Sequence, residues 1–291
     1  MFDLLTQQAA ADAEAIFTST GTATYTVPAG VVYISAVCIG GGGGSSSSGG
    51  PGSGPRSGQG GSLAYATLQV TAGETLTIVV GAGGAKGVPT GTFSDEKGSN
   101  GGSSSISRGG TTLLLAPGGK GGGQTSGDSV VIDADALVSG SNAGGVGQTD
   151  DRFSVTGLGG GGAGGYSGAG GQGDGGGQNA TNGSGGGGGG GGASNGVVID
   201  GGGGTYRYGG YGGGTDIFGQ GANGAGRDIN EGNGGTGSFV SNTNGFGGGA
   251  PAAAGSNATG GHVVGKDGRH GAVRIIVPGR KRLFPSTNTT N

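Results

Sequence analysis

The chain is poor in the residue types from which enzymes usually build a core and a reactive site. It has no tryptophan, one cysteine and one methionine, and aromatic residues make up 5% of its 291 positions. Val, Ile, Leu and Phe together supply about 17%, which is below the usual range for a globular domain. A formal net charge of only -3 gives little repulsion to keep the chain open as a disordered polymer. We therefore expect an ordered protein that is not an ordinary soluble enzyme.

Other scarcities exclude specialised classes. With 8 prolines, and with runs such as Gly185–Gly192 that break any Gly-X-Y period, the chain is not a collagen. The single Cys38 cannot form an intramolecular disulfide, which fits synthesis in a reducing compartment. We expect no secretory signal, because no early Lys or Arg precedes an apolar run. No apolar run approaches the length of a membrane span, and the slightly acidic charge does not indicate nucleic-acid binding.

Glycine is what the chain has instead, at 87 of 291 positions. A glycine run can adopt the extended helix of polyproline II, which has three residues per turn and leaves every N–H and C=O pointing outward. When such helices pack side by side, the missing Cβ lets their backbones approach and hydrogen-bond to one another. The composition therefore predicts a polyglycine II sandwich, whose core is made of backbone.

Strand-like segments flank the glycine. β-branched and aromatic residues separated by turn signals predict four short antiparallel strands, and one further strand of the same quality lies near the far end. These segments are 23–27, 31–39, 63–70, 76–80 and 272–277. We predict a mainly β fold in which a small antiparallel β-sandwich base is closed by the C-terminal strand, with the glycine-rich middle as one long excursion.

A short helix is predicted over residues 3–16, with Asp3 as its cap. Leu4, Leu5 and Ile16 belong to its apolar stripe, which would dock either on the β base or on a partner protein. The predicted organisation is a docking helix (1–16), a β base (17–80), a polyglycine II region with display loops (81–265), a closing strand (266–279) and a C-terminal tail (280–291).

Three stretches carry a family resemblance: FTSTGTATYTVPAGV at 17–31, GGSLAYATLQVTAGETLTIVVGAGG at 60–84, and GAVRIIVPG at 271–279. With the glycine-rich interior between them, they resemble the Gly-rich structural proteins of tailed bacteriophages. The closing GRKRLFPST is similar to versions in phages of cyanobacteria. The interior is similar in kind to the tail-fibre tip adhesins of T-even phages, in which a polyglycine II sandwich displays variable receptor-binding loops.

The resemblance implies a non-enzymatic virion protein, a tail or tail-fibre component that contacts the host through loops between glycine helices. Its partners would be other virion proteins and a host-surface glycan or outer-membrane protein, and it would be a monomeric tip or a homotrimer. A capsid or neck decoration protein is the alternative. A remote alternative is an ice-binding protein, although that function predicts a regular row of Thr or Ala, and the spacing here is irregular.

The interruptions of the glycine are the places to look for a binding site. Three of the seven tyrosines fall within six residues, at Tyr206, Tyr208 and Tyr211, with Arg207 between them and Phe218 after them. Tyr and Arg are common anchors of binding surfaces. The alternative is that these rings are apolar filler at the ends of glycine helices. Phe239 to Phe246 is a second, weaker candidate of the same type.

No catalytic, cofactor or metal site is predicted. GxGxxG matches are expected by chance at this glycine content, and Cys38 in an apolar strand indicates an inert core thiol. His262 and His270 could face one another across a hairpin, but ordinary surface roles are the simpler interpretation. An acidic group could supply calcium ligands, yet it matches no EF-hand pattern, so a solvated loop edge is preferred. Its members are Asp128, Asp133, Asp135, Asp150 and Asp151.

Overall fold

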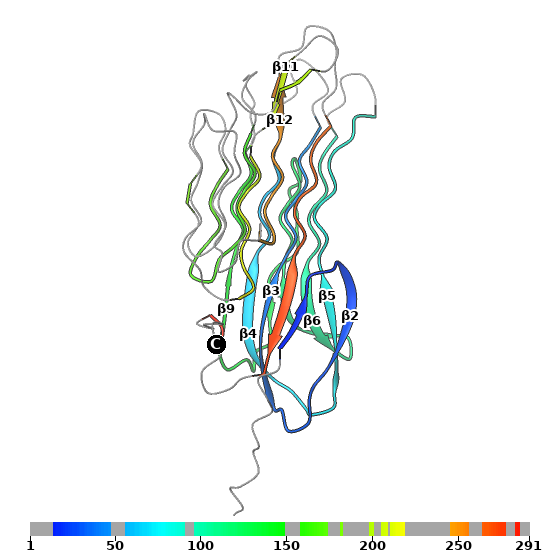
Figure 1. The fold of residues 1–291 in the computed structure, drawn as a ribbon, viewed down its shortest axis with the longest axis vertical. Helices are drawn as coiled ribbons and strands as arrows, with labels where there is room; N and C mark the ends of the chain where they lie inside the picture. The colour runs from blue at the N-terminus through cyan, green and yellow to red at the C-terminus, as the bar shows by residue number, and fades with distance from the viewer. Residues whose placement is uncertain are drawn as a thin grey trace, which may run out of the picture.

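The computed structural model describes residues 14–47, 56–90, 96–148, 158–173, 181–182, 198–200, 205–208, 210–218, 245–255, 264–277 and 283–285. Over these ranges the protein is mainly β and elongated, with two antiparallel sheets at one end and a bundle of extended segments beyond them (Figure 1). The described ranges contain no helix, and so none that could cross a membrane.

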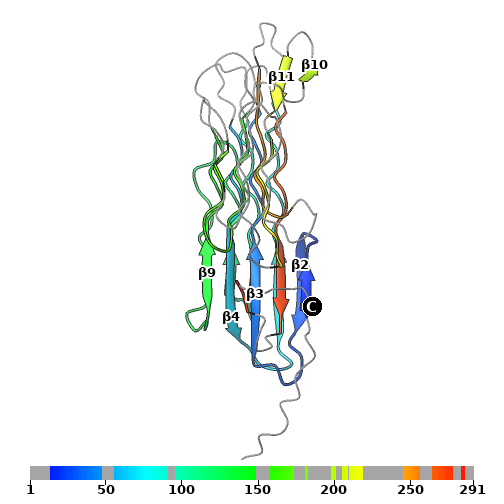
Figure 2. The same cartoon turned by 60° about the vertical axis from the view of Figure 1, so that its left-hand side comes forward.

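Each sheet of the base has five strands. The first has the order β1 (Glu14–Phe17), β13 (Ala272–Ile276), β3 (Tyr33–Ile39), β4 (Leu63–Gln69) and β9 (Ser139–Asn142). The second has the order β2 (Gly21–Thr26), β5 (Thr75–Val80), β6 (Ser104–Arg108), β7 (Thr111–Ala116) and β8 (Val131–Ile132). A small third sheet of β10 (Val198–Asp200), β11 (Thr205–Tyr208) and β12 (Ala253–Gly255) lies at the other end of the molecule (Figures 1 and 2).

The predicted strands at both ends of the chain are confirmed, although they divide between the two sheets. β3 pairs with β4, and β2 pairs with β5. β13 lies between β1 and β3, with Val273 opposite Cys38, so the C-terminal strand does close the base. The main core lies between the sheets and contains Ile34, Leu76 and Ile106, all fully buried.

Two predictions about the base are wrong. The helix expected over 3–16 does not extend to Ile16, because Glu14–Phe17 is the edge strand β1; residues 1–13 lie outside the described residues. The region 81–265 is not a single excursion either, because the chain returns to the base in strands β6 to β9. Three of these strands, β6, β8 and β9, have two to five residues and the sequences SSISR, VI and SGSN, so their side chains gave little strand signal; β7, with the sequence TTLLLA, carried a signal that the prediction did not use.

A second apolar cluster covers the outer face of the first sheet. It contains Val37 and Ile39 from β3 together with Tyr166, Ile217 and Phe284 from later segments. The rings of Tyr166 and Phe284 stack with centroids 5.8 Å apart. Because both faces of β3 are covered, its sequence YISAVCI shows no alternation of polar and apolar residues.

Arg274 is fully buried on β13, and its side chain contacts residues of this second cluster. It forms an ion pair with Glu14 of β1, and its Nη1 donates to the carbonyl of Ile217 at 3.3 Å. The guanidinium carbon lies 4.7 Å from the ring centroid of Phe218. A buried charge requires such partners, so Arg274 ties the edge strand β1 to the outer layer.

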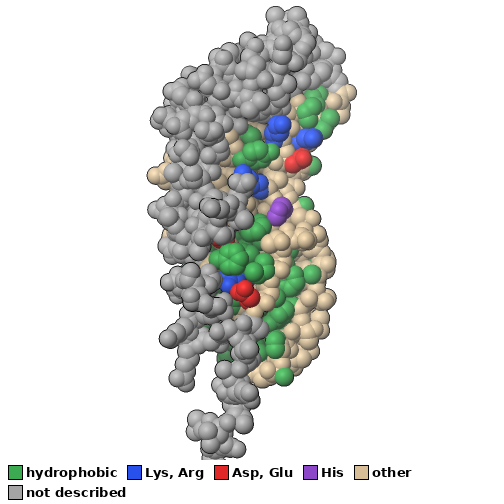
Figure 3. Space-filling view, in the orientation of Figure 1, with side chains coloured by type: hydrophobic (Ala, Val, Ile, Leu, Met, Phe, Trp, Pro, Cys, Tyr) green, Lys and Arg blue, Asp and Glu red, His purple; other side chains and the backbone are tan. Residues whose placement is uncertain are grey.

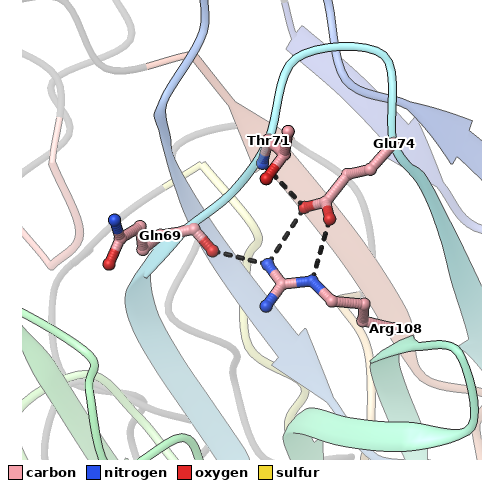
Figure 4. Close-up of polar contacts among 4 residues, drawn as sticks. All are labelled: Gln69, Thr71, Glu74 and Arg108. Atoms are coloured by element: carbon pink, nitrogen blue, oxygen red, sulfur yellow. Dashed lines mark hydrogen bonds and ion pairs between the residues drawn. The ribbon is translucent and has the colours of Figure 1, made fainter.

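The turn between β4 and β5 is held to the β6–β7 hairpin by one ion pair (Figure 4). Arg108 donates from Nε to Glu74 at 2.9 Å and from Nη2 both to Glu74 and to the carbonyl of Gln69. The same carboxylate accepts the backbone N–H of Thr71. Gly73, at φ 82°, allows the tight turn that brings these groups together.

Beyond the sheets, extended backbone segments lie side by side and hydrogen-bond to one another; we call this part the glycine block. Its segments are 40–47, 56–62, 81–87, 96–102, 117–123, 143–148, 158–165, 169–173, 210–215, 245–252 and 264–271. Several continue directly from base strands, as 40–47 continues from β3 (Figure 1).

Segment 40–47 lies at the centre of the glycine block. Its successive N–H groups donate in rotation to three neighbouring segments, so that each neighbour accepts a hydrogen bond from every third residue of segment 40–47. Residues 40, 43 and 46 donate to 56–62; residues 41, 44 and 47 donate to 96–102; residues 42 and 45 donate to 264–271. Its carbonyls accept from 81–87, 117–123 and 245–252. The segment therefore has six hydrogen-bonded neighbours and a period of three residues.

The backbones in the glycine block are too close for side chains. A Cβ added to Gly43 would lie 2.1 Å from the carbonyl oxygen of Lys120, and one added to Gly58 would lie 2.0 Å from that of Gly43. Side chains return where the central segment ends: Ser45, Ser46 and Ser47 each accept, through the hydroxyl oxygen, a backbone N–H of a neighbour. These serines are buried and continue the backbone pattern of the segment, and their hydroxyl groups are hydrogen-bonded as buried polar groups require.

Candidate functional site

The predicted binding cluster is divided among three places in the structure. Tyr206, Arg207 and Tyr208 lie in β11, the middle strand of the small sheet at the end of the molecule opposite the base (Figures 1 and 2). β11 pairs with β12 with Arg207 opposite Ala254. Phe239 lies outside the described residues. These three residues, which were expected in a display loop, therefore lie together in a short strand.

Tyr211 lies apart from β11, in the glycine block. It is half-buried, and the guanidinium carbon of Arg269 lies 5.5 Å from its ring centroid. Burial raises the pKa of Tyr211, and nearby Asp267 raises it further, while the charge of Arg269 acts in the opposite direction. Burial also lowers the pKa of Arg269. The phenol and the guanidinium therefore form one partly desolvated pair.

Phe246 and Phe218 belong to the other end of the glycine block, where it meets the base. Both pack against the second apolar cluster. Phe246 also lies 5.5 Å from the ring of His270, and its backbone pairs with Thr215. Phe218 lies under Arg274. These contacts correspond to the packing interpretation of the two rings rather than to a loop-tip surface.

Sequence reasoning missed Arg269, which lies beside Tyr211, and it considered His270 only for a pairing with His262 and not for its contact with Phe246. The signal for them was present as a local three-residue period, Gly265-Lys-Asp-Gly268-Arg-His-Gly271. The glycine-rich interior as a whole has no fixed repeat length, because this three-residue period holds only within single segments.

The residues predicted to dock the protein are only partly described. Leu4 and Leu5 lie outside the described residues. Ile16 lies in β1, at the edge of the first sheet, and is 41% exposed. An exposed side chain on an edge strand is accessible to a partner, so Ile16 keeps the position that a docking contact requires.

The candidate chemical groups are dispersed. Burial raises the pKa of the Cys38 thiol, which is fully buried and unpaired, in agreement with an inert core thiol. His270 contacts the carbonyl of Gly271 through Nδ1, and His262 lies outside the described residues. Within the described ranges no three His, Cys, Asp or Glu side chains gather closely enough to hold a metal ion.

The acidic group predicted as a loop edge is likewise held by local contacts where it is described. Asp128 accepts a hydrogen bond from the hydroxyl of Ser103, and Asp133 accepts the backbone N–H of Asp135 at 3.1 Å. Asp150 and Asp151 lie outside the described residues.

Comparison with known protein families matches the chain to a glycine-rich domain over residues 18–278. The match spans both sheets of the base and the glycine block, and the chain belongs to this glycine-rich domain family. No curated protein matches the chain.

Proposed function

We propose that this member of the glycine-rich domain family is a non-enzymatic structural protein of a bacteriophage virion, most simply a tail or tail-fibre component. In this role the base attaches to other virion proteins, the glycine block acts as a stiff spacer, and the segments at its far end contact the host surface. The phage assignment rests on the resemblance of residues 17–31, 60–84 and 271–279 to Gly-rich phage proteins.

The observation that carries the structural part is the hydrogen bonding of segment 40–47. Its period of three residues and its six neighbours are what a bundle of polyglycine II helices requires, since that helix has three residues per turn and directs its polar groups outward. We therefore propose that the glycine block is a polyglycine II sandwich. Backbone hydrogen bonds between segments far apart in sequence make such a bundle stiff.

The arrangement of the elements supports a display role. The two large sheets lie at one end, and the sheet formed by β10, β11 and β12 lies at the other (Figure 2). Because the packing of the glycine block uses backbone, the connecting loops are not required to fill a core. The loops and the short strands at the far end are therefore free to carry residues chosen for a host-surface glycan or outer-membrane protein, such as the Tyr206–Tyr208 stretch of β11.

Two measurements test this proposal. Mass spectrometry of purified virions, followed by gold labelling with an antibody against this chain, should find it on the tail or its fibres. The purified protein should bind host cells and compete with virion adsorption. Labelling on the capsid or neck would favour the decoration-protein alternative, whereas absence from virions would overturn the virion assignment. Sedimentation of the purified protein distinguishes the monomeric tip from the trimer.

A further inference from the structure

Strand β2 leaves one side of its backbone without a partner among the described residues. It lies at the edge of the second sheet, where it pairs with β5 alone (Figures 1 and 2). Val27, the residue after β2, donates its N–H to the carbonyl of Glu74, so its backbone groups point toward β5. Since this direction alternates along a strand, the N–H and C=O groups of Thr22, Thr24 and Thr26 point away from the sheet.

The other edge strands of the base are short or charged. β8 has two residues, and β9 has four and continues directly into the glycine block. β1 has four residues and carries Glu14, which is ion-paired to Arg274. β2 has six residues, GTATYT, and its register with β5 is continuous from Gly21 to Thr26. Proteins usually protect an exposed edge with charge, proline, a bulge or a short strand, so an edge without these features indicates a pairing site.

The surface around this edge is uncharged. On the outer face of the sheet, the exposed threonines of β2 lie opposite Thr75, Thr77 and Val79 of β5. Figure 3 shows green and tan, without red or blue, at the lower right margin of the molecule, where Figure 1 places β2. A neutral edge lets two copies of a chain with a net charge of -3 approach without bringing like charges opposite each other.

We propose that β2 pairs with β2 of a second copy of this chain, around a two-fold axis at Thr24. The inference goes beyond the proposed function and is independent of the virion assignment. Ala23 and Tyr25 pack against the main core, so β2 keeps its two faces, and pairing must leave the threonines of both copies on one face. The register with Thr24 opposite its own copy and Thr22 opposite Thr26 meets this condition and uses all three outward-facing residues.

This register pairs the free backbone groups of the strand. Each of the three opposed threonine pairs exchanges two N–H···O bonds, so the interface gains about six hydrogen bonds. Threonine opposite threonine is a favourable cross-strand pair, and Ala23 lies opposite Tyr25. Among the strands that the structure describes at a sheet edge, β2 alone has six residues, so a second β2 is the partner of matching length. Pairing closes this edge in both copies, and the assembly therefore stops at two.

Antiparallel pairing reverses the direction of the second copy. β2 runs along the long axis of the molecule, and the glycine block lies beyond its Gly21 end (Figure 1). The two bases therefore lie side by side, and the two glycine blocks point away from each other. The dimer is longer than the monomer, and the two small sheets of β10, β11 and β12 lie at its opposite ends.

Sedimentation velocity of the full chain over a range of concentrations tests the dimer. We expect a monomer–dimer equilibrium, with a dimer that is longer than the monomer in small-angle X-ray scattering. Thr24→Lys places two ammonium groups opposite each other at the axis and should raise the dimer Kd at least tenfold. The matched control is Thr112→Lys, which adds the same charge to the same face on β7, three strands away, and should change the Kd less than twofold.

Oxidative cross-linking tests the register. Thr24→Cys brings two thiols together across the axis, with Cα atoms about 5.5 Å apart, which a disulfide can span. Thr22→Cys is the control, because its two copies lie four residues apart along the strand direction, about 13 Å, which a disulfide cannot span. Cys38 is fully buried and does not compete. We expect a disulfide-linked dimer from Thr24→Cys and a monomer from Thr22→Cys.

Melting temperatures establish that all variants are folded, and three results would overturn the proposal. The first is a wild-type chain that stays monomeric at every concentration reached. The second is a dimer, or a larger assembly, that folded Thr24→Lys does not weaken. The third is cross-linking of Thr22→Cys as efficient as that of Thr24→Cys.

Discussion

Replacing Gly43 by alanine should destabilise the protein far more than one methyl group ordinarily does. Gly43 lies in the central segment, where an added Cβ would be 2.1 Å from the carbonyl oxygen of Lys120. Real Cβ contacts are longer than 3.0 Å, so backbone must move by about 1 Å. The displaced carbonyl accepts from Gln59, while Gly43 itself donates to Gln59 and accepts from Ala250.

Three buried backbone hydrogen bonds are thus affected. At about 1 kcal/mol net for each bond, with about 1–3 kcal/mol for overpacking, the loss is about 4–6 kcal/mol. This is a large part of the roughly 5–15 kcal/mol that stabilises a typical protein. Since a domain of this size loses about 2–4 °C per kcal/mol, the Tm should fall by about 8–24 °C in differential scanning calorimetry.

Two alanine variants separate the steric cause from other effects of losing a glycine. Gly127→Ala places its methyl group 3.6 Å from the Lys120 side chain, an ordinary contact, and should leave the Tm unchanged or slightly raised. Gly73→Ala has open space but a φ of +82°, so it should cost only about 1–2 kcal/mol of backbone strain. A Gly43→Ala protein as stable as Gly127→Ala would refute the close-packed backbone core.

Three further outcomes are expected. Because burial raises the pKa of Cys38, its thiol should not react with Ellman's reagent at pH 8 until the protein unfolds; rapid reaction of the native protein would show that the strand opens. Phe284→Ala should lower the unfolding free energy by about 3–5 kcal/mol in urea titration, since the ring is buried against Tyr166, and a loss below about 1 kcal/mol would mean that the C-terminal segment does not pack there. Glu74→Gln should cost only about 1 kcal/mol, because Arg108 is 40% exposed and solvent screens the pair, and the Arg108→Gln, Glu74→Gln double variant should be no less stable than either single variant.

The strands that flank the glycine could be predicted because their side chains carry the information. The run 31–39 contains β-branched and aromatic residues bounded by turns, and β3 is found there at Tyr33–Ile39. The return of the C-terminal strand to the base was also predictable, since 272–277 was the only other run of similar quality, although its pairing with β1 was not predicted. By contrast, β9 pairs through backbone with a sequence of Ser, Gly and Asn, and nothing in its side chains marks it as a strand.

The candidate site was predictable only in part, for a related reason. Tyr206, Tyr208 and Tyr211 are conspicuous in sequence, but what surrounds Tyr211 is decided by which glycine segments lie side by side. Arg269 is 58 positions from Tyr211, and the two meet because Gly248 leaves space between their segments. Interchangeable glycines carry no information about which segments become neighbours.

The central position of segment 40–47 has a consequence for how the chain is made. Two of its N–H groups, on Gly42 and Ser45, find their acceptors on Arg269 and Lys266, more than 220 positions later. A ribosome has therefore synthesised most of the chain before these acceptors exist. Such long-range closure slows folding, so the glycine block is completed only at the end of synthesis. Chains interrupted before segment 264–271 expose backbone and the edge of β3 with which β13 should pair, which marks them for aggregation or proteolysis.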